Sequence, residues 1–506
     1  MACLFPPRMT VRMRKPELVS PKTPTPRETK PLSDVDDQAS LRYQMPLLWF
    51  YKSKAAEAAA GSNKPQPGSD VTDDPAELIR EGLAKALVFY YPLAGRLVEG
   101  PNKKLSVDCT GEGVLFVRAE ANLSLQKLGR FVQSPSPYLQ KLLYHVPGSD
   151  YITGAPLLLL QVTRFTCGGF ALGVRLNHTM LDGYGIFLFL KAVCELATGA
   201  LAPSVLPVWE RQLLTAAADS SETAAAEDTM YGSSVTVATS NKKQFKLLDI
   251  ERWASFALDF DKVAAQPRFF FYPTILRPIL LHRSFTLTPQ DIQALKDRVL
   301  EEGLGKCSTF EVISACLWKC RTVGLQPDPN ATVTITFPTD IRGRSSTTGL
   351  TIPRGYYGNA IVMLSAAANA KVLCESPLSY AIQLIRESKE KLNGDYVKSA
   401  IDFLVVNERR RLPIERNLLI SDLSKIGMEK LDFGWGNAIY AGTATAAYGA
   451  TFLERPKSSA SVEGGVLVPI ALPHVSMLIF SREFKKMAMT SSSNTPVLRL
   501  GPYTRL

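Results

Sequence analysis

One segment of the chain combines a histidine, an aspartate and a glycine at a spacing suited to proton transfer. His178 is followed four residues later by Asp182 and then by Gly183. Imidazole is the side chain best matched to general-base work near neutral pH, so His178 could take a proton from a substrate hydroxyl. Asp182 could orient the ring, and Gly183 could turn the chain. The same spacing arises by chance in many long chains, so a histidine that merely ends a strand would also fit.

The other candidate residues for chemistry are weaker. His145, His282 and His474 are the remaining histidines, and none has a carboxylate and a glycine placed as His178 has. Residues 432–436 read Asp-Phe-Gly-Trp-Gly, and their glycines predict a tight loop. No kinase catalytic loop accompanies this segment, and no motif of serine hydrolases, zinc proteases or phosphate-binding loops occurs. His178 is therefore the principal candidate for catalysis.

The residues on either side of His178 predict a rigid frame for it. The apolar run 170–176 predicts a buried strand, paired as a hairpin with residues 157–165. A helix is predicted from about residue 184 to about residue 196, before Gly199. A strand, a histidine, a turn and a helix in this order would hold a reactive side chain in a fixed place.

Strands and helices alternate through the rest of the chain. Three helix starts carry residues typical of N-terminal caps, namely Asp74 with Pro75 and Glu77, Thr288 with Asp291, and Ser308 with Glu311. Further strands are predicted at residues 47–51, 104–107, 114–120, 284–287, 332–337, 360–364 and 466–471. Because both halves mix the two kinds of element, the sequence predicts an α/β fold.

The length of the chain predicts two domains. At 506 residues it exceeds what one hydrophobic core usually holds. From about residue 213 to about residue 246 the sequence is rich in Ala, Ser and Thr without an amphipathic period, which indicates a crossover between domains. We therefore divide the chain into a first domain at residues 1–212, a crossover at 213–280 and a second domain at 281–506. Both domains are expected to be layered, with mixed sheets flanked by helices, and to be similar in size.

The composition is that of an ordinary globular protein with a mild positive charge. The formal net charge is +11 and the hydrophobic content is 46%. No dense basic run interleaved with aromatic residues occurs, which argues against nucleic acid as a partner. A mildly basic surface suits an anionic small molecule. The eight cysteines are scattered without the spacing of a zinc site, which indicates reduced thiols and no metal.

The sequence predicts a soluble cytoplasmic protein. No apolar stretch approaches the length of a membrane span, and the proline-broken N-terminus lacks the apolar region of a signal peptide. Thr504, Arg505 and Leu506 have the small, basic, leucine order of the peroxisomal targeting tripeptide, with Thr in place of Ser. A peroxisomal location is therefore the alternative to the cytoplasm.

Taken together, residues 178–183 and 432–436 resemble the two signature motifs of the BAHD acyl-CoA-dependent acyltransferases of plants. Four further segments are similar to that family, and the likeness covers nearly the whole chain: residues 91–96, 109–113, 161–164 and 356–359. Four more look most like the alcohol acyltransferases typified by benzyl alcohol O-benzoyltransferase: residues 15–18, 24–26, 32–37 and 41–42. Residues 213–278 depart from the family because they are longer than the corresponding region of relatives.

The resemblance implies two chloramphenicol-acetyltransferase-like domains with an active-site channel at their interface and His178 at its middle. Acyl-CoA would enter from one face and a small alcohol, such as benzyl alcohol, from the other. His178 would take the proton of the alcohol as the oxygen attacks the thioester of a benzoyl or acetyl group. A permanently bound cofactor, a metal and a membrane partner are not expected, and the protein is expected to be a monomer.

The resemblance also assigns the supporting residues. It implies that Asp182 turns away from the histidine and pairs with Arg342, so that Asp182, Gly183 and Arg342 support the site. Asp432, Gly434 and Gly436 would be structural and lie near the CoA entrance. Two alternatives stay open: an acyltransferase for another acceptor, such as a hydroxycinnamoyl acceptor, an amine or a terpenoid, or a non-catalytic relative that binds CoA or another ligand.

Overall fold

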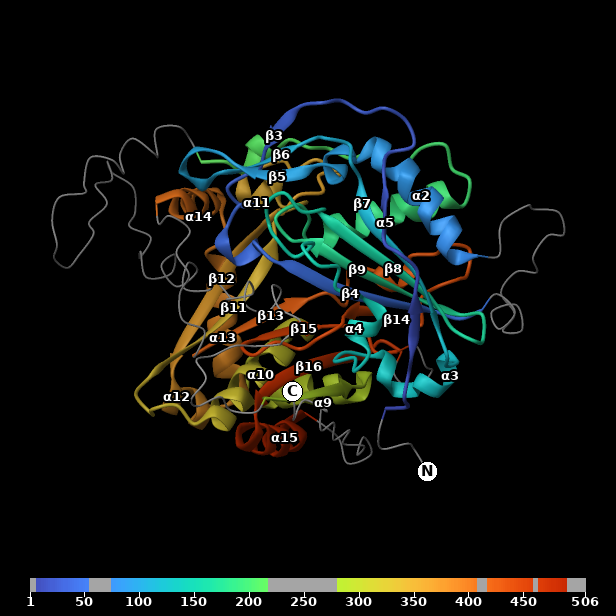
Figure 1. Cartoon of the computed structure of the whole chain (residues 1–506). Coiled ribbons are helices and arrows are strands. Elements are labelled where there is room, and N and C mark those ends of the chain that lie inside the picture. Colours follow the sequence, from blue (N-terminus) through green and yellow to red (C-terminus); the bar gives the residue numbers. More distant parts are fainter. Residues whose placement is uncertain (1–5, 54–73, 217–279, 407–415, 458–462, 489–506) are drawn as a thin grey trace, which may run out of the picture.

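The computed structural model describes residues 6–53, 74–216, 280–406, 416–457 and 463–488, so most of the predicted crossover and the C-terminal tripeptide lie outside it. The described chain forms two layered parts (Figure 1). Elements of the first half, blue to green, occupy the upper and right-hand part of the view, and most elements of the second half occupy the left and lower part. Mixed sheets flanked by helices build both parts, which confirms the predicted fold class.

The first half is built on a mixed seven-stranded sheet in which β7 and β8 run parallel and the other pairs run antiparallel. Its strands are β1 (Val11–Met13), β2 (Glu17–Val19), β4 (Gln44–Tyr51), β7 (Val114–Ala121), β8 (Leu158–Arg164), β9 (Phe170–Asn177) and β14 (Tyr440–Thr443). A smaller sheet has β3 (Thr29–Pro31), β5 (Arg96–Glu99) and β6 (Leu105–Asp108). The helices are α2 (Pro75–Phe89), α3 (Leu125–Leu128), α4 (Leu139–Leu142) and α5 (Gly183–Ala197).

The second half contains a four-stranded sheet and a two-stranded sheet. The strands of the larger sheet, in spatial order, are β12 (Ile361–Asn369), β11 (Thr332–Asp340), β13 (Asn417–Asp422) and β15 (Ala450–Leu453). The smaller sheet pairs β10 (Leu280–Leu287) with β16 (Val466–Pro473). The helices are α9 (Pro289–Glu301), α10 (Thr309–Leu325), α11 (Ser345–Thr348), α12 (Ala370–Glu375), α13 (Leu378–Glu390), α14 (Gly394–Val406) and α15 (His474–Ala488).

Local sequence signals account for several of these helices. Thr288 and Ser308 cap α9 and α10, and each forms the predicted reciprocal pair with a carboxylate three residues on. Asp74 caps α2 by accepting from the Ala76 N–H at 3.0 Å. Glu77 does not complete that cap, because its carboxylate pairs with Arg118 on the neighbouring β7. A long-range ion pair has here replaced the local bond that the sequence predicts.

A segment from the second half of the chain is incorporated into the first part of the fold. Strand β14, from the second half of the chain, pairs antiparallel with β4 at the edge of the first sheet. The indole Nε1 of Trp49 donates to the Met428 carbonyl at 3.0 Å, and the Tyr51 hydroxyl donates to the Leu431 carbonyl at 2.9 Å. Residues 428–443 therefore lie in the first sheet and its core, an exchange that a division of the chain at residues 213 and 281 does not include.

A buried carboxylate lies beside this exchanged strand. Glu454 follows β15 and is 1% exposed. Its carboxylate accepts from the Thr443 N–H at 2.7 Å, from the Tyr440 hydroxyl at 2.6 Å and from the Thr443 hydroxyl. Burial raises the pKa of Glu454 to about 7, although these hydrogen bonds favour the ionised form. Glu454 therefore joins β14 to the second half through a group that titrates near neutral pH.

We expect Glu454→Gln to gain stability relative to the wild type as the pH rises from about 5 to about 8. The folded protein keeps the proton of this carboxyl up to a pH of about 7, whereas the unfolded chain releases it near 4.5. Wild-type stability is lost between these values, by up to about 3 kcal/mol. Melting temperatures of both proteins at the two pH values test this, and a constant difference between them would contradict it.

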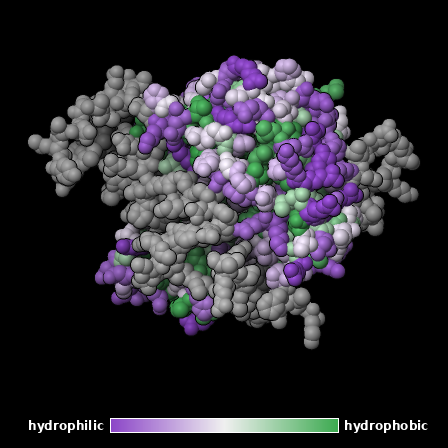
Figure 2. Space-filling model, in the orientation of Figure 1, coloured by the Kyte–Doolittle hydropathy of each residue, from purple (hydrophilic) through white to green (hydrophobic). Residues whose placement is uncertain are grey.

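The described part of the surface is mainly polar on the side shown in Figure 2. The hydrophobic side chains there form small separate groups. Within the described ranges, no helix is long and apolar enough to cross a membrane. The cysteines of the same ranges are free thiols: Cys109, Cys167, Cys194, Cys307, Cys316, Cys320 and Cys374.

Candidate active site

His178 lies at the junction of the two halves. It directly follows Asn177, the last residue of β9. Its N–H donates to the Tyr43 carbonyl in the first half at 3.0 Å. Its own carbonyl accepts from the side-chain Nδ2 of Asn359, in the second half, at 2.9 Å. The backbone of His178 is thus held on one side by each half of the molecule.

The surroundings of the His178 imidazole favour its neutral form. Its ring packs against Tyr43, with ring centroids 5.3 Å apart and planes 42° apart. The Nδ1 atom is buried and has no well-aligned hydrogen-bond partner among the described residues. Burial lowers the pKa of His178 below 6.5, and the residue's own carbonyl, Asp182 and Asn359 oppose that shift only in part. At neutral pH the ring is therefore in the form that can accept a proton.

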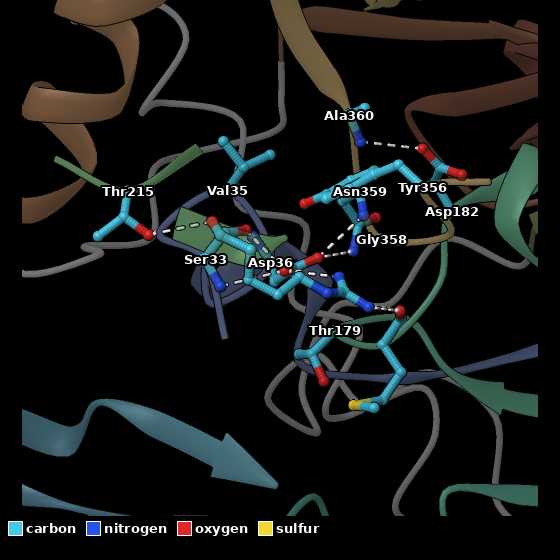
Figure 3. A network of polar contacts seen from close by, with 12 residues as sticks. Ser33, Val35, Asp36, Thr179, Asp182, Thr215, Tyr356, Gly358, Asn359 and Ala360 are labelled. Atoms are coloured by element: carbon cyan, nitrogen blue, oxygen red, sulfur yellow. Dashed lines mark hydrogen bonds and ion pairs between the residues drawn. The ribbon is translucent and has the colours of Figure 1, made fainter. Parts of the chain in front are cut away.

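Asp182 turns toward the helix and the second half. One oxygen accepts from the Gly185 N–H at 2.8 Å, which caps α5. The other accepts from Arg342 Nη1 at 2.9 Å and from the Ala360 N–H at 3.1 Å. Figure 3 shows the bond between Ala360 and Asp182. Both oxygens of the carboxylate are therefore engaged in bonds that point away from the imidazole. Asp182 follows His178 by four residues because it is the N-terminal cap of α5.

Arg342 follows β11 and is enclosed on several sides. Besides Asp182, its guanidinium donates to the carbonyls of Tyr356 at 3.3 Å and Gly358 at 2.5 Å, and it lies 5.0 Å from the centre of the Tyr184 ring. Burial opposes its charge, but Asp182 and Asp340 raise the pKa of Arg342 overall. The predicted pairing of Asp182 with Arg342 is thus present as a largely buried ion pair.

Two glycines at the start of α5 allow the helix to pack closely against residues of the second half. Gly183 is the first residue of the helix, and an added Cβ would lie 2.9 Å from Ile426 Cδ1. At Gly185 an added Cβ would lie 2.0 Å from the Tyr357 carbonyl oxygen. At Gly185 the close atom belongs to the backbone, so this position needs glycine, whereas at Gly183 it is the end of the Ile426 side chain, which can move. Sequence reasoning overlooked Gly185.

Asp432 organises a separate loop. Its Oδ1 accepts from the backbone N–H groups of Gly434, Trp435 and Gly436 at 2.7, 3.0 and 2.9 Å. Gly434 and Gly436 have φ angles of +90° and +76°, which side chains on L-residues rarely tolerate. Phe433 is buried in the core of the first half. The segment is a self-capped loop that anchors its aromatic side chains.

This loop lies at the opposite end of β9 from His178. Phe433 contacts Tyr51, and Trp435 contacts Phe170, with ring centroids 5.8 and 5.5 Å apart. Phe170 begins β9, and the strand extends seven residues further to Asn177, a length of about 23 Å. The structure therefore brings together His178, Asp182, Gly183 and Arg342, and leaves Asp432, Gly434 and Gly436 remote from them.

The comparisons with known proteins fit this geometry. The sequence model of the Transferase family matches residues 9–264 and 274–487. The chain belongs to this family, the BAHD acyltransferases. It is 40% identical to Alcohol acyltransferase 17 of Actinidia deliciosa over 486 residues, which is 96% of this chain and 95% of that protein. It is 39% identical to Benzyl alcohol O-benzoyltransferase of Petunia hybrida over 482 residues, 94% of each chain.

A solved structure shows the same fold. The crystal structure of vinorine synthase matches with a TM-score of 0.65 and 19% sequence identity, over 96% of this chain and 100% of that one. The family membership and the alcohol acyltransferase relatives make this chain an acyl-CoA-dependent acyltransferase that acts on alcohols. Acyl-CoA is its co-substrate.

Proposed function

We propose that this enzyme transfers a benzoyl or acetyl group from acyl-CoA to the hydroxyl of a small alcohol such as benzyl alcohol, with His178 as general base. The observation that carries the proposal is the position of His178 at the junction of the two halves, where its partly buried imidazole has a lowered pKa. The names of two relatives, an alcohol acyltransferase and a benzyl alcohol O-benzoyltransferase, support the substrate class.

The chemistry requires one base that changes roles. With Nδ1 buried, Nε2 of His178 takes the hydroxyl proton as the alcohol oxygen bonds to the thioester carbonyl carbon. The tetrahedral intermediate then collapses, the carbon–sulfur bond breaks, and the CoA thiolate receives the proton from the imidazolium. The products are an ester and free CoA. The alcohol is itself the nucleophile, so no acyl-enzyme intermediate forms.

The remaining predicted residues have supporting roles in this proposal. Asp182, Gly183 and Arg342 hold the turn that presents His178 and the start of α5. Asp432, Gly434 and Gly436 hold the loop at the far end of β9 and so act through the fold. The substrates would meet at His178 in a channel between the halves, with CoA entering near that loop.

We expect kcat/KM to stay level as the pH falls through 6.5, the ordinary pKa of histidine, and to fall only at lower pH. Burial lowers the pKa of His178, so the base form persists below that value. Initial rates across about pH 4.5 to about pH 8 test this, with stability followed in parallel. An acid limb centred above 6.5 would contradict the assignment.

A substrate panel tests the proposed reaction. Benzoyl-CoA and acetyl-CoA are each offered with benzyl alcohol, aliphatic alcohols, an amine and a terpenoid alcohol, and the ester or amide is measured directly by mass. Direct product detection identifies the ester or amide itself, whereas a thiol reagent reports only CoA and adds a background from free cysteines such as the partly exposed Cys167. Highest kcat/KM with benzyl alcohol or another small alcohol supports the proposal. A preference for an amine or a terpenoid, or no turnover with any pair, contradicts it.

We further propose a monomeric cytoplasmic enzyme. Thr504, Arg505 and Leu506 lie outside the described residues, so the peroxisomal address stays a prediction from sequence. Fluorescence microscopy of the chain with and without its last three residues, tagged at the N-terminus, distinguishes the two locations.

A further inference from the structure

A buried carboxylate that the reaction does not use lies beside the His178 turn. Asp36, in the acidic segment 33–38, is fully buried. Its Oδ2 accepts from the Ser33 hydroxyl at 2.6 Å, the Ser33 N–H at 3.1 Å and Arg211 Nη1 at 2.7 Å. Its Oδ1 accepts from the Asn359 N–H at 2.9 Å and from Asn359 Nδ2 at 2.8 Å. Figure 3 shows Asp36 between Ser33 and Asn359.

Asn359 links Asp36 to the backbone of His178. The same Nδ2 that donates to Asp36 also donates to the His178 carbonyl at 2.9 Å. The peptide group before His178 is held by Tyr43, and the one after it is held by Asn359. Both backbone torsions of His178 are therefore constrained, one from each half of the molecule.

Arg211 fixes a second point on the turn. It is 1% exposed, and its Nη2 donates to the Met180 carbonyl at 2.9 Å. Its guanidinium lies 4.5 Å from the centre of the Trp209 ring and 5.1 Å from that of Tyr357. Gly358 makes room for it, because an added Cβ there would lie 1.8 Å from Arg211 Nη1. The Asp36–Arg211 pair is thus built into a close-fitting site.

The imidazole depends on this backbone for its orientation. Its Nδ1 has no well-aligned partner among the described residues, and Asp182 is engaged elsewhere. The ring direction must then follow from the His178 backbone and from packing against Tyr43. A base displaced by about 1 Å can lose on the order of 10²-fold in rate, so this backbone matters for catalysis.

We propose that Asp36 and Asn359 are positioning residues for acyl transfer: the Asp36 carboxylate orients the Asn359 amide, which fixes the His178 carbonyl and thereby the imidazole. The inference rests on the proposed role of His178 as general base. It assigns a task to residues in two of the segments that resemble the family, residues 32–37 and residues 356–359.

The first test is Asn359→Ala. We expect kcat to fall about 10- to 100-fold, with the KM values for acyl-CoA and alcohol within about threefold of wild type. In spectra of protein carrying ¹⁵N-labelled histidine, the ring signals of His178 should shift or broaden, while those of His145, His282 and His474 stay in place. The His178 signals are identified by their loss in His178→Ala.

Asn417→Ala is the matched control. Asn417 is also a buried asparagine of the second half, and it accepts from the Thr334 and Thr336 hydroxyls at 2.9 and 3.1 Å. Its replacement should lower the melting temperature but leave kcat and the His178 signals unchanged. If this control alters kcat as much as Asn359→Ala does, the effect is a general loss of stability and the proposal is wrong.

Asp36→Asn is the second variant, and it keeps the shape of the side chain if Asn359→Ala fails to fold. It should move the same His178 signals and lower kcat. Because Asp36 acts through Asn359, the double variant should lose less than the product of the two single effects. Unchanged His178 signals and kcat in both single variants overturn the proposal. A full rate in His178→Ala instead refutes the base assignment, while the spectra still judge the positioning separately.

Discussion

Replacing His178 with alanine is expected to lower kcat by about 10²–10⁴-fold, the usual contribution of a general base. Both halves of the molecule hold the backbone of His178, through Tyr43 and Asn359. Burial lowers the pKa of its imidazole, so the ring is unprotonated at neutral pH. Its Nδ1 has no well-aligned described partner, so removing the ring should not leave another side chain unpaired. The variant should therefore fold and bind CoA.

The measurement combines rates with binding. kcat and KM are determined with saturating alcohol, CoA affinity by calorimetry, and the melting temperature on the same samples. His282→Ala is the matched control, since His282 on β10 also has a pKa lowered by burial and takes no part in the proposed site. We expect the control to retain kcat. Near-normal ester formation by His178→Ala would eliminate the general-base mechanism.

The frame around His178 could be predicted because its signals are local. An apolar strand followed by a histidine, a turn and a helix is encoded within residues 170–196, and β9 and α5 lie there. That Asp182 caps α5 was learned only from the structure. The caps at Thr288 and Ser308 are encoded in the same way, within four residues each. Short-range hydrogen bonds depend on residue type and spacing, both of which the sequence displays.

The contacts that fix the site depend on residues far apart in the chain. Asn359 reaches His178 across 181 positions, and Arg211 reaches Asp36 across 175. Residues 32–37 were noted for their family resemblance, but the sequence could not show that Asp36 faces the turn, because that follows from how the halves pack. The pairing of β14 with β4 was missed for the same reason. The Asp182–Arg342 pair was predicted only because a family resemblance supplied the long-range partner.

The two signature motifs therefore differ in kind. His178 and Asp182 lie where the halves meet, and their partners come from both. Asp432 closes a loop on its own backbone, and the neighbouring aromatic residues enter the core of the first half. The Asp432 carboxylate accepts hydrogen bonds from three successive backbone N–H groups, and these bonds account for the residue types of the motif without a substrate contact. The motif shares the Asp-Phe-Gly sequence with kinases but lacks the catalytic loop that accompanies that motif in them.

Removing Asp182 is expected to destabilise the folded protein by about 3–5 kcal/mol, the usual cost of breaking a buried ion pair from one side. Asp182→Ala would leave Arg342 buried without its carboxylate, free the Ala360 N–H, and remove the cap of α5. Urea unfolding and melting temperature measure the loss. If the purified variant keeps the wild-type melting temperature but loses turnover, Asp182 acts directly in catalysis and the structural assignment is wrong.

Two comparisons sharpen this result. The double variant Asp182→Ala/Arg342→Ala should lose less stability than the sum of the single variants, because no buried charge is left unpaired. Glu81→Ala breaks the exposed pair with Lys22, whose side chains are 36% and 57% exposed, and should cost less than about 1 kcal/mol. A similar loss in Asp182→Ala and Glu81→Ala would mean that burial does not strengthen the Asp182–Arg342 pair. A loss several times larger in Asp182→Ala would show that this pair holds the His178 turn against the second half.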